Sequence, residues 1–197
     1  MFRKAAERGR QGLVPFDADR SAVEAARRDP RRFEPLYRKY VGQVYSFAVY
    51  ELRDHHAAED VTEQVFLQAL RGLPDFEERG AGPASTFRVW LFQIARRVLA
   101  NEHRRRARHP QASLDAALDV SAAGLDPAAL AASSDEARRA WHAIGRLPTE
   151  RRRVLTLRFV EEMSTPEIAG VMGRSEGAVR VLIHRALRAV ATELERD

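Results

Sequence analysis

The sequence predicts an all-α protein of two small helical domains joined by a flexible linker, the second being a helix-turn-helix domain. Apolar residues recur every three to four positions almost throughout the 197 residues, and no convincing run alternates with period two. Near residue 110 the composition changes to Ala, Ser, Asp, Pro and Gly, which is typical of a linker. A capped helix–turn–helix pattern then follows in the C-terminal domain.

The first domain, residues 17–109, is expected to begin with two helices. The first runs from about Ala18 to Arg28 and ends before Pro30, because the residue that precedes a proline disfavours helix. The second begins near Phe33. Its apolar stripe, at helical spacing, consists of Leu36, Tyr40, Val44, Phe47 and Tyr50.

Two further helices complete that domain. A turn at residues 54–56 precedes the third helix, which stops at residues 72–74. Its inward residues are predicted to be Ala58, Val61, Val65, Ala69 and Leu70. Residues 75–85 form a loop, and Ser85 or Thr86 caps the fourth helix. The inner face of that helix consists of Phe87, Leu91, Ile94, Ala95 and Val98.

Positive charge is concentrated in short segments. Residues 1–16 hold four basic residues and one acid, and we expect this basic N-terminal extension to be disordered. Residues 88–109 hold seven arginines and one acid, whereas the predicted linker, residues 110–134, holds three aspartates and no base. A focused basic patch beside an acidic flank favours a polyanionic partner.

The second domain, residues 135–197, contains the most specific local pattern. Apolar positions from Trp141 to Phe159 predict two helices, and two short helices follow them. Ser164 and Glu167 form a capping box, with a proline in the first turn. Gly173 suits the left-handed end of that helix, and Ser175 can cap the next one. This spacing indicates a helix-turn-helix unit.

The last helix is interpreted as a recognition helix that lies in the major groove of DNA. An exposed face with arginine and histidine near a helix N-terminus suits contacts to bases and phosphates together. The alternative is a charged solvent face on a three-helix bundle. The residues predicted to contact DNA here are Ser175, Glu176, Gly177, Arg180, Val181, His184, Arg185 and Arg188.

The fourth helix of the first domain presents a second basic face, near aromatic residues. Cations on the backbone and rings against bases are the way proteins hold single-stranded nucleic acid. In the alternative interpretation, Phe87 and Trp90 belong to the core, and burial is favoured for Phe87 by its spacing. The outward residues are predicted to be Arg88, Gln93, Arg96, Arg97, Asn101, Arg104 and Arg105.

Four segments together resemble a known family. Residues 33–40, 58–66 and 87–97 are similar to the first conserved domain of the extracytoplasmic-function (ECF) sigma factors of bacterial RNA polymerase. Residues 147–187 are similar to their second domain. The resemblance covers about residues 18–109 and 135–194, in the family's order, and implies a factor that initiates transcription from specific promoters.

The resemblance also implies site residues and partners. The segment that docks on the clamp of core RNA polymerase would contain Asp60, Glu63, Gln64 and Phe66. The loop 75–85 would capture a flipped base of the melted −10 element, and the recognition helix would bind the −35 duplex. The residues assigned to the −10 element are Phe76, Gly80, Gly82, Arg88, Trp90, Gln93, Arg96, Arg97, Asn101 and Arg104. Family members are commonly held by an anti-sigma protein, which nothing in this sequence identifies.

Two features depart from the family. Apolar Val181 and Leu182 follow Arg180, where relatives often carry a polar residue and a base, so the −35 sequence is not inferred. The N-terminal extension lies outside the family's shared core.

Other classes of function find little support. No phosphate-binding loop, nucleophile elbow or zinc-protease helix occurs, so we expect no enzyme, no cofactor and no catalytic residue. The adjacent His55 and His56 point different ways, so no metal site is expected. With no cysteine, signal peptide or long apolar run, a cytoplasmic location without membrane contact is expected. The alternatives are a helix-turn-helix repressor or activator with a helical N-terminal regulatory domain and, less favoured, an RNA-binding regulator.

Overall fold

The described residues of this computed structural model, 19–79, 85–108 and 135–195, form helices and contain no strand. Those before the linker are α2 (Arg20–Arg28), the short 3-10 helix η1 (Pro30–Phe33), α3 (Glu34–Leu52), α4 (His55–Gly72) and α5 (Phe87–Arg108). Those after it are α7 (Asp135–Arg146), α8 (Thr149–Phe159), α9 (Thr165–Met172) and α10 (Glu176–Leu194). The N-terminal extension 1–16 and the linker 110–134 lie outside the described residues.

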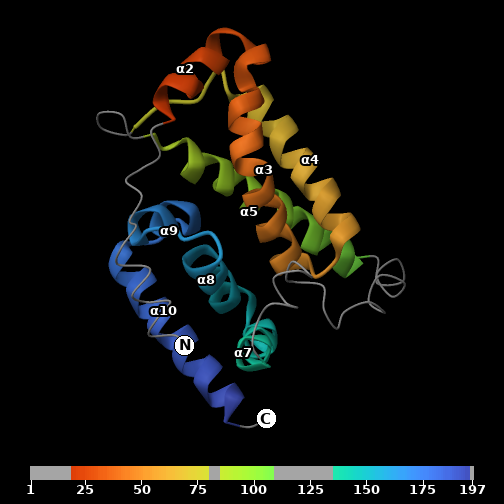
Figure 1. The fold of residues 1–197 in the computed structure, drawn as a ribbon, viewed down its shortest axis with the longest axis vertical. Coiled ribbons are helices and arrows are strands. Elements are labelled where there is room, and N and C mark those ends of the chain that lie inside the picture. Colours follow the sequence, from red (N-terminus) through yellow and green to blue (C-terminus); the bar gives the residue numbers. More distant parts are fainter. Residues whose placement is uncertain (1–18, 80–84, 109–134, 196–197) are drawn as a thin grey trace.

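Helices α2 to α5 gather in the upper part of the molecule and α7 to α10 in the lower part (Figure 1). Helix α3 packs along α4, and α5 crosses behind them. The predicted inner face of α5 is buried, with Phe87 and Leu91 fully enclosed. Asp19 attaches α2 to α3, because its buried carboxylate accepts hydrogen bonds from Lys39 and the Tyr40 hydroxyl.

The helix-turn-helix pattern is confirmed in detail. Ser164 and Glu167 form a capping box at the start of α9. Gly173 ends the helix with φ of 64°, a left-handed conformation that glycine adopts without strain. The Ser175 side chain then accepts a hydrogen bond from the Ala178 N–H at the start of α10.

Three details of the predicted helices were wrong. Asp54 is the N-cap of α4, so His55 and His56 lie in its first turn and not in a loop. Leu70 is 37% exposed, since it lies at the edge of the α3–α4 groove. Helix α10 is 19 residues long, and its C-terminal half packs on α7, which holds it as one continuous element.

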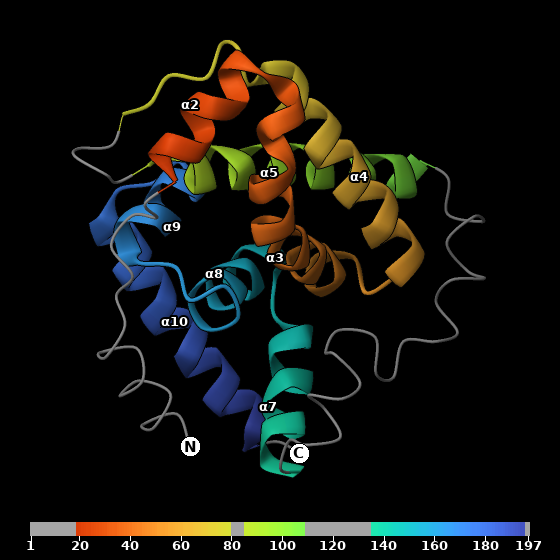
Figure 2. The same ribbon diagram turned by 45° about the horizontal axis from the view of Figure 1, so that its top comes forward.

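No sequence pattern indicates contact between the two domains, but the structure places them in contact. Helix α9 lies against α5, and α8 lies against α3 (Figure 2). The Tyr50 ring of α3 stacks near Trp141 of α7, with 5.1 Å between ring centroids. Both tyrosine and tryptophan are only half-buried, so this contact forms the rim of the interdomain interface.

Candidate nucleic-acid interface

A row of arginines follows one face of α5. Arg97, Asn101 and Arg104 are exposed, and Arg96 is half-buried. Within the described part of the chain, Arg96, Arg97 and Arg104 have no carboxylate within ion-pair distance. Their charge is therefore available to a polyanion, as the sequence predicted.

The end of α5 is less basic than its arginine count suggests. Glu102 accepts hydrogen bonds from Arg105 at 2.7 and 2.9 Å and from Arg106 at 2.8 Å. The hydrogen bond from Arg105 is the main reason that the pKa of Glu102 is lowered. Arg106 also donates to Asp54 at 2.7 Å. These contacts pair Arg105 and Arg106 with carboxylates, so the row that remains without them consists of Arg96, Arg97 and Arg104.

A pocket of about 420 Å³ opens at the start of α5, within the size range of ligand sites. Phe76 and Trp90 line it, with 5.0 Å between their ring centroids. Trp90 is half-buried, but Phe76 is only 4% exposed and also packs edge-on against Phe87. The assignment of Phe76 as a DNA contact therefore needs correction: its ring belongs to the core. The predicted Gly80 and Gly82 lie outside the described residues.

Glu78 bonds to Thr86, which lines this pocket, although Glu78 was not among the predicted site residues. Its carboxylate accepts hydrogen bonds from the Thr86 N–H at 2.7 Å, the Thr86 hydroxyl at 2.9 Å and the Ser85 hydroxyl. Glu78 precedes α5 by nine residues in the sequence, so no acid in the first turn of the helix signals this contact. In the fold, the carboxylate complements the unpaired N–H groups at the start of the helix. Glu78 thus joins the loop to the start of α5.

Arg88 and Gln93 were expected to face solvent, and this was wrong. The Arg88 side chain is 11% exposed and donates to Gln43 at 3.1 Å and to the carbonyl oxygen of Glu161. Gln93 donates to the carbonyl oxygen of Gly170 at 2.8 Å. Both side chains point from α5 into the second domain, which covers this part of the helix.

Helix α10 presents the predicted recognition face to solvent. The exposed residues are Ser175, Glu176, Gly177, Arg180, Val181, His184, Arg185 and Arg188. Val181 is 50% exposed, so this face presents one apolar side chain among its polar ones. The Arg180 guanidinium lies 3.3 Å from the Glu176 carboxylate. The two side chains are 65% and 50% exposed, so the ion pair is weak.

A cluster of three arginines lies beside that face. Arg151 of α8 and Arg185 and Arg188 of α10 line a shallow pocket of about 370 Å³. Arg151 was missed because it precedes the helix-turn-helix pattern by thirteen residues or more along the chain. Clustered arginines favour phosphate contacts, since such contacts need charge and not base-specific geometry.

The third predicted surface lies on α4. Asp60, Glu63 and Gln64 are exposed there, as expected for a docking face. Phe66 is 4% exposed and packs edge-on against Tyr37, with 4.8 Å between ring centroids. Phe66 therefore does not lie on the exposed face with Asp60, Glu63 and Gln64, as its assignment implied; its buried ring belongs to the wall of the groove between α3 and α4.

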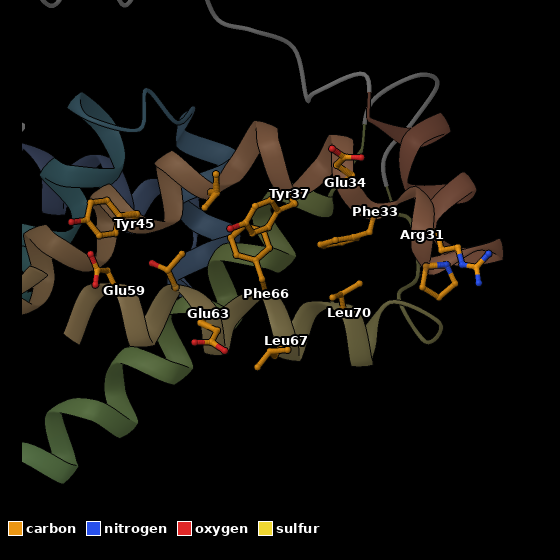
Figure 3. A pocket seen from close by; sticks show the side chains of 13 residues that line it. Arg31, Phe33, Glu34, Tyr37, Tyr45, Glu59, Glu63, Phe66, Leu67 and Leu70 are labelled. Carbon is orange, nitrogen blue, oxygen red and sulfur yellow. The ribbon is translucent and has the colours of Figure 1, made fainter. Parts of the chain in front are cut away.

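A groove between α3 and α4 adjoins this surface (Figure 3). It encloses about 770 Å³, with Tyr37, Leu67 and Leu70 exposed along it. Glu59 and Glu63 lie at its α4 edge. The combination of apolar floor and acidic edge suits a protein partner with apolar and basic side chains.

The described residues contain neither a metal-binding cluster nor a membrane-spanning helix. Across 19–79, 85–108 and 135–195, no group of three or more His, Cys, Asp or Glu side chains is arranged to hold a metal ion. His55 instead pairs with the Tyr45 hydroxyl at 2.8 Å. None of the helices in these ranges has the length and apolar character needed to cross a membrane.

Comparison with known proteins identifies both domains. Residues 36–109 match sigma-70 region 2, and residues 137–190 match sigma-70 region 4. Over 192 residues the chain is 32% identical to the RNA polymerase sigma-H factor of Pseudomonas aeruginosa, covering 93% of this chain and 97% of that protein. The chain belongs to the ECF sigma factors. The basic helix α5 is therefore part of region 2, and the helix-turn-helix is part of region 4.

Two further relatives of this sigma factor carry the ECF name. The chain is 29% identical over 167 residues to SigX of Bacillus subtilis, covering 83% of this chain and 84% of that one. It is 32% identical over 165 residues to BldN of Streptomyces coelicolor, covering 84% of this chain but 61% of BldN. The chain thus spans about three fifths of the length of BldN.

Solved sigma factors share the fold. The structure of CnrH in complex with the cytosolic domain of CnrY matches with a TM-score of 0.66 and 27% identity, over 92% of this chain and 99% of that one. RpoE from Bartonella quintana, in complex with the anti-sigma factor NepR, matches with a TM-score of 0.65 over 84% of this chain and 98% of that one. Its 22% identity supports likeness of fold alone.

Proposed function

We propose that this sigma factor divides promoter recognition between its two domains. In region 4, α10 lies in the major groove of the −35 duplex, with Arg180 and Val181 on base edges and the Arg151 cluster on phosphates. In region 2, Arg96, Arg97 and Arg104 hold the melted −10 strand beside the Trp90 pocket. The observation that best supports this proposal is the row of arginines without carboxylate partners beside that pocket.

Core RNA polymerase is proposed to dock on α4, through exposed Asp60, Glu63 and Gln64 and the adjoining groove. Acidic and amide groups on one helical face suit a basic partner surface. The factor would accordingly act in the cytoplasm, where it has no catalytic task of its own. Because CnrH and RpoE were solved with a second protein bound, an anti-sigma protein is a proposed further partner.

The test combines transcription and footprinting. Purified core polymerase and this chain are incubated with a genomic DNA library, and start sites that depend on the chain are mapped. At one such promoter, permanganate then detects unpaired thymines with wild type and with the Arg96→Ala/Arg97→Ala variant. We expect the variant to retain upstream duplex binding but to lose most of the open complex. The salt slope of its binding to the −10 strand should fall by roughly 1 to 2.

A matched control variant distinguishes the loss of the α5 site from the loss of two positive charges. Arg28→Ala/Arg32→Ala removes the same charge from exposed positions on α2 and η1, and it should open DNA as the wild type does. If both variants lose the open complex equally, the arginines of α5 act only through the net charge of the protein and not as a site. Normal opening by Arg96→Ala/Arg97→Ala would contradict the proposed division of labour.

A further inference from the structure

Two arginines of the described residues form ion pairs across the interdomain interface. Arg153 of α8 donates to both carboxylate oxygens of Glu51 on α3, at 2.8 Å each. Arg88 of α5 lies 3.5 Å from Glu167 of α9. All four side chains are at most 11% exposed. The interface therefore balances these buried charges pairwise, as burial requires.

One buried carboxyl group at this interface, that of Glu161, forms no ion pair among the described residues. Glu161, between α8 and α9, is 4% exposed, and its Oε1 has no hydrogen-bond partner among the described residues. From the first domain, the groups that face it are Ser46 and Tyr50 of α3 and Arg88 of α5. Arg88 donates to the Glu161 backbone carbonyl and is already paired with Glu167. No second cation is placed to balance an ionised Glu161 in the described part of the chain.

The burial of Glu161 depends on the contact between domains. Ser46, Tyr50 and Arg88 belong to region 2, whereas Glu161 belongs to region 4. When the domains separate, these groups leave and water can reach the carboxyl. A carboxyl is ionised in water near neutral pH but is neutral when it is buried without a partner.

We propose that closing of region 4 onto region 2 is coupled to the uptake of one proton by the Glu161 side chain. The closed form also holds Arg88 and Gln93, two residues assigned to the −10 strand, so closing competes with promoter binding. That second statement extends the proposed function of region 2 to Arg88 and Gln93, which lie on the same helix as Arg96 and Arg97; the proton coupling does not depend on it. A fall in pH then shifts the factor toward the closed form, and a rise in pH shifts it toward the open form, in which α5 is accessible.

The electrostatics of the site agree with this coupling. Burial raises the pKa of Glu161 from 4.5 to about 8, although Arg88 and Ser46 act in the opposite direction. Burial and Glu161 together also raise the pKa of Tyr50. Because the pKa is raised in the closed form, the stabilisation is complete below pH 4.5 and is lost as pH rises toward 8. From about pH 6 to about pH 8 the closing constant should fall roughly fiftyfold.

The test uses fluorescence energy transfer in the free full-length chain. The chain has no cysteine, so Ala100→Cys on α5 and Ala191→Cys on α10, both exposed, accept a dye pair without other changes. Transfer is recorded from about pH 6 to about pH 9. We expect wild type to lose transfer as pH rises, whereas Glu161→Gln, which is neutral at every pH, should stay closed throughout. The His103→Gln control, which removes the titratable neighbour of Glu51, should keep the wild-type curve.

The outcomes are distinct. A flat wild-type curve, or an unchanged transition in Glu161→Gln, would overturn the proposal. If that variant does not fold by circular dichroism, the infrared spectrum of wild type decides: a protonated-carboxyl band near neutral pH supports the proposal, and its absence contradicts it. If the domains open with pH but binding of a −10 strand does not change, the DNA role of Arg88 and Gln93 fails and the proton coupling stands.

Discussion

The proposed base recognition by the sigma factor rests on one exposed side chain of α10, that of Arg180. Its ion pair with Glu176 is exposed and worth little, so the guanidinium can exchange it for a guanine edge. Arg180→Ala should weaken binding to the −35 duplex by about 1–3 kcal/mol. Titration of a labelled duplex measures this loss. Arg139→Ala, on exposed α7, removes the same charge and should lose far less.

Polymerase docking is tested by Asp60 and Gln64, one turn apart on α4. Replacing both by Ala should weaken core binding, and helix content should not change because both side chains are exposed. Co-purification with core polymerase and circular dichroism report the two effects. Ser21→Ala/Glu24→Ala on exposed α2 is the control. Normal co-purification of the α4 variant would remove this helix from the docking surface.

The exposure of individual residues followed from helical spacing wherever a helix faces solvent. Spacing placed Arg180 on an outer face, and the family resemblance placed Asp60 and Gln64 on a docking face; all three side chains are exposed. Spacing failed for Arg88 and Gln93, because a face that is outward in one domain is covered by the other. The polar character of Arg88 and Gln93 suggested exposure, but polar side chains can be buried when they form hydrogen bonds, as both do here.

The helix-turn-helix was predictable at the scale of elements because each boundary has its own local chemistry. Ser164, Glu167 and Ser175 cap helices through side chains that lie within three residues of their targets. The turn before α4 was mistaken, since Asp54 was counted in a loop when it caps the helix through the Ala57 N–H. Caps and loops share residue types, and only the backbone conformation distinguishes them.

Two glycines provide a matched test of the turn between α9 and α10. A Cβ at Gly173 or at Gly177 would have open space around it, so only backbone conformation separates them. Gly173 has φ of 64°, and Gly173→Ala should destabilise region 4 by about 1–2 kcal/mol. Gly177 is helical, and Gly177→Ala should stabilise by about 0.5–1 kcal/mol. Urea unfolding of the full chain measures both signs, and equal effects would contradict the assigned turn geometry.

For the molecule as a whole, the contact between the two domains could not be predicted from the sequence. Each domain has its own apolar stripe, and the contacts between the domains combine hydrogen bonds, ion pairs and apolar packing that follow no separate sequence period. Helix α9 approaches α5 closely because Gly170 has no side chain at the crossing. In the sequence, this glycine stands inside the helix-turn-helix segment, where no local pattern marks it as a crossing point between domains.

Gly170 therefore allows the closed arrangement to be tested without changing any charge. A Cβ at Gly170 would lie 2.7 Å from Cγ1 of Val89, a side chain that is stiff at χ1. Gly170→Ala should push α9 away from α5 and increase the radius of gyration measured by small-angle X-ray scattering. The change should not unfold α9, since alanine favours helix over glycine by about 1 kcal/mol. Adding Val89→Ala removes the clashing methyl groups and should restore the compact form. A Gly170→Ala chain as compact as wild type would show that the domains do not meet at this crossing in solution, and expansion without rescue by Val89→Ala would place the strain elsewhere.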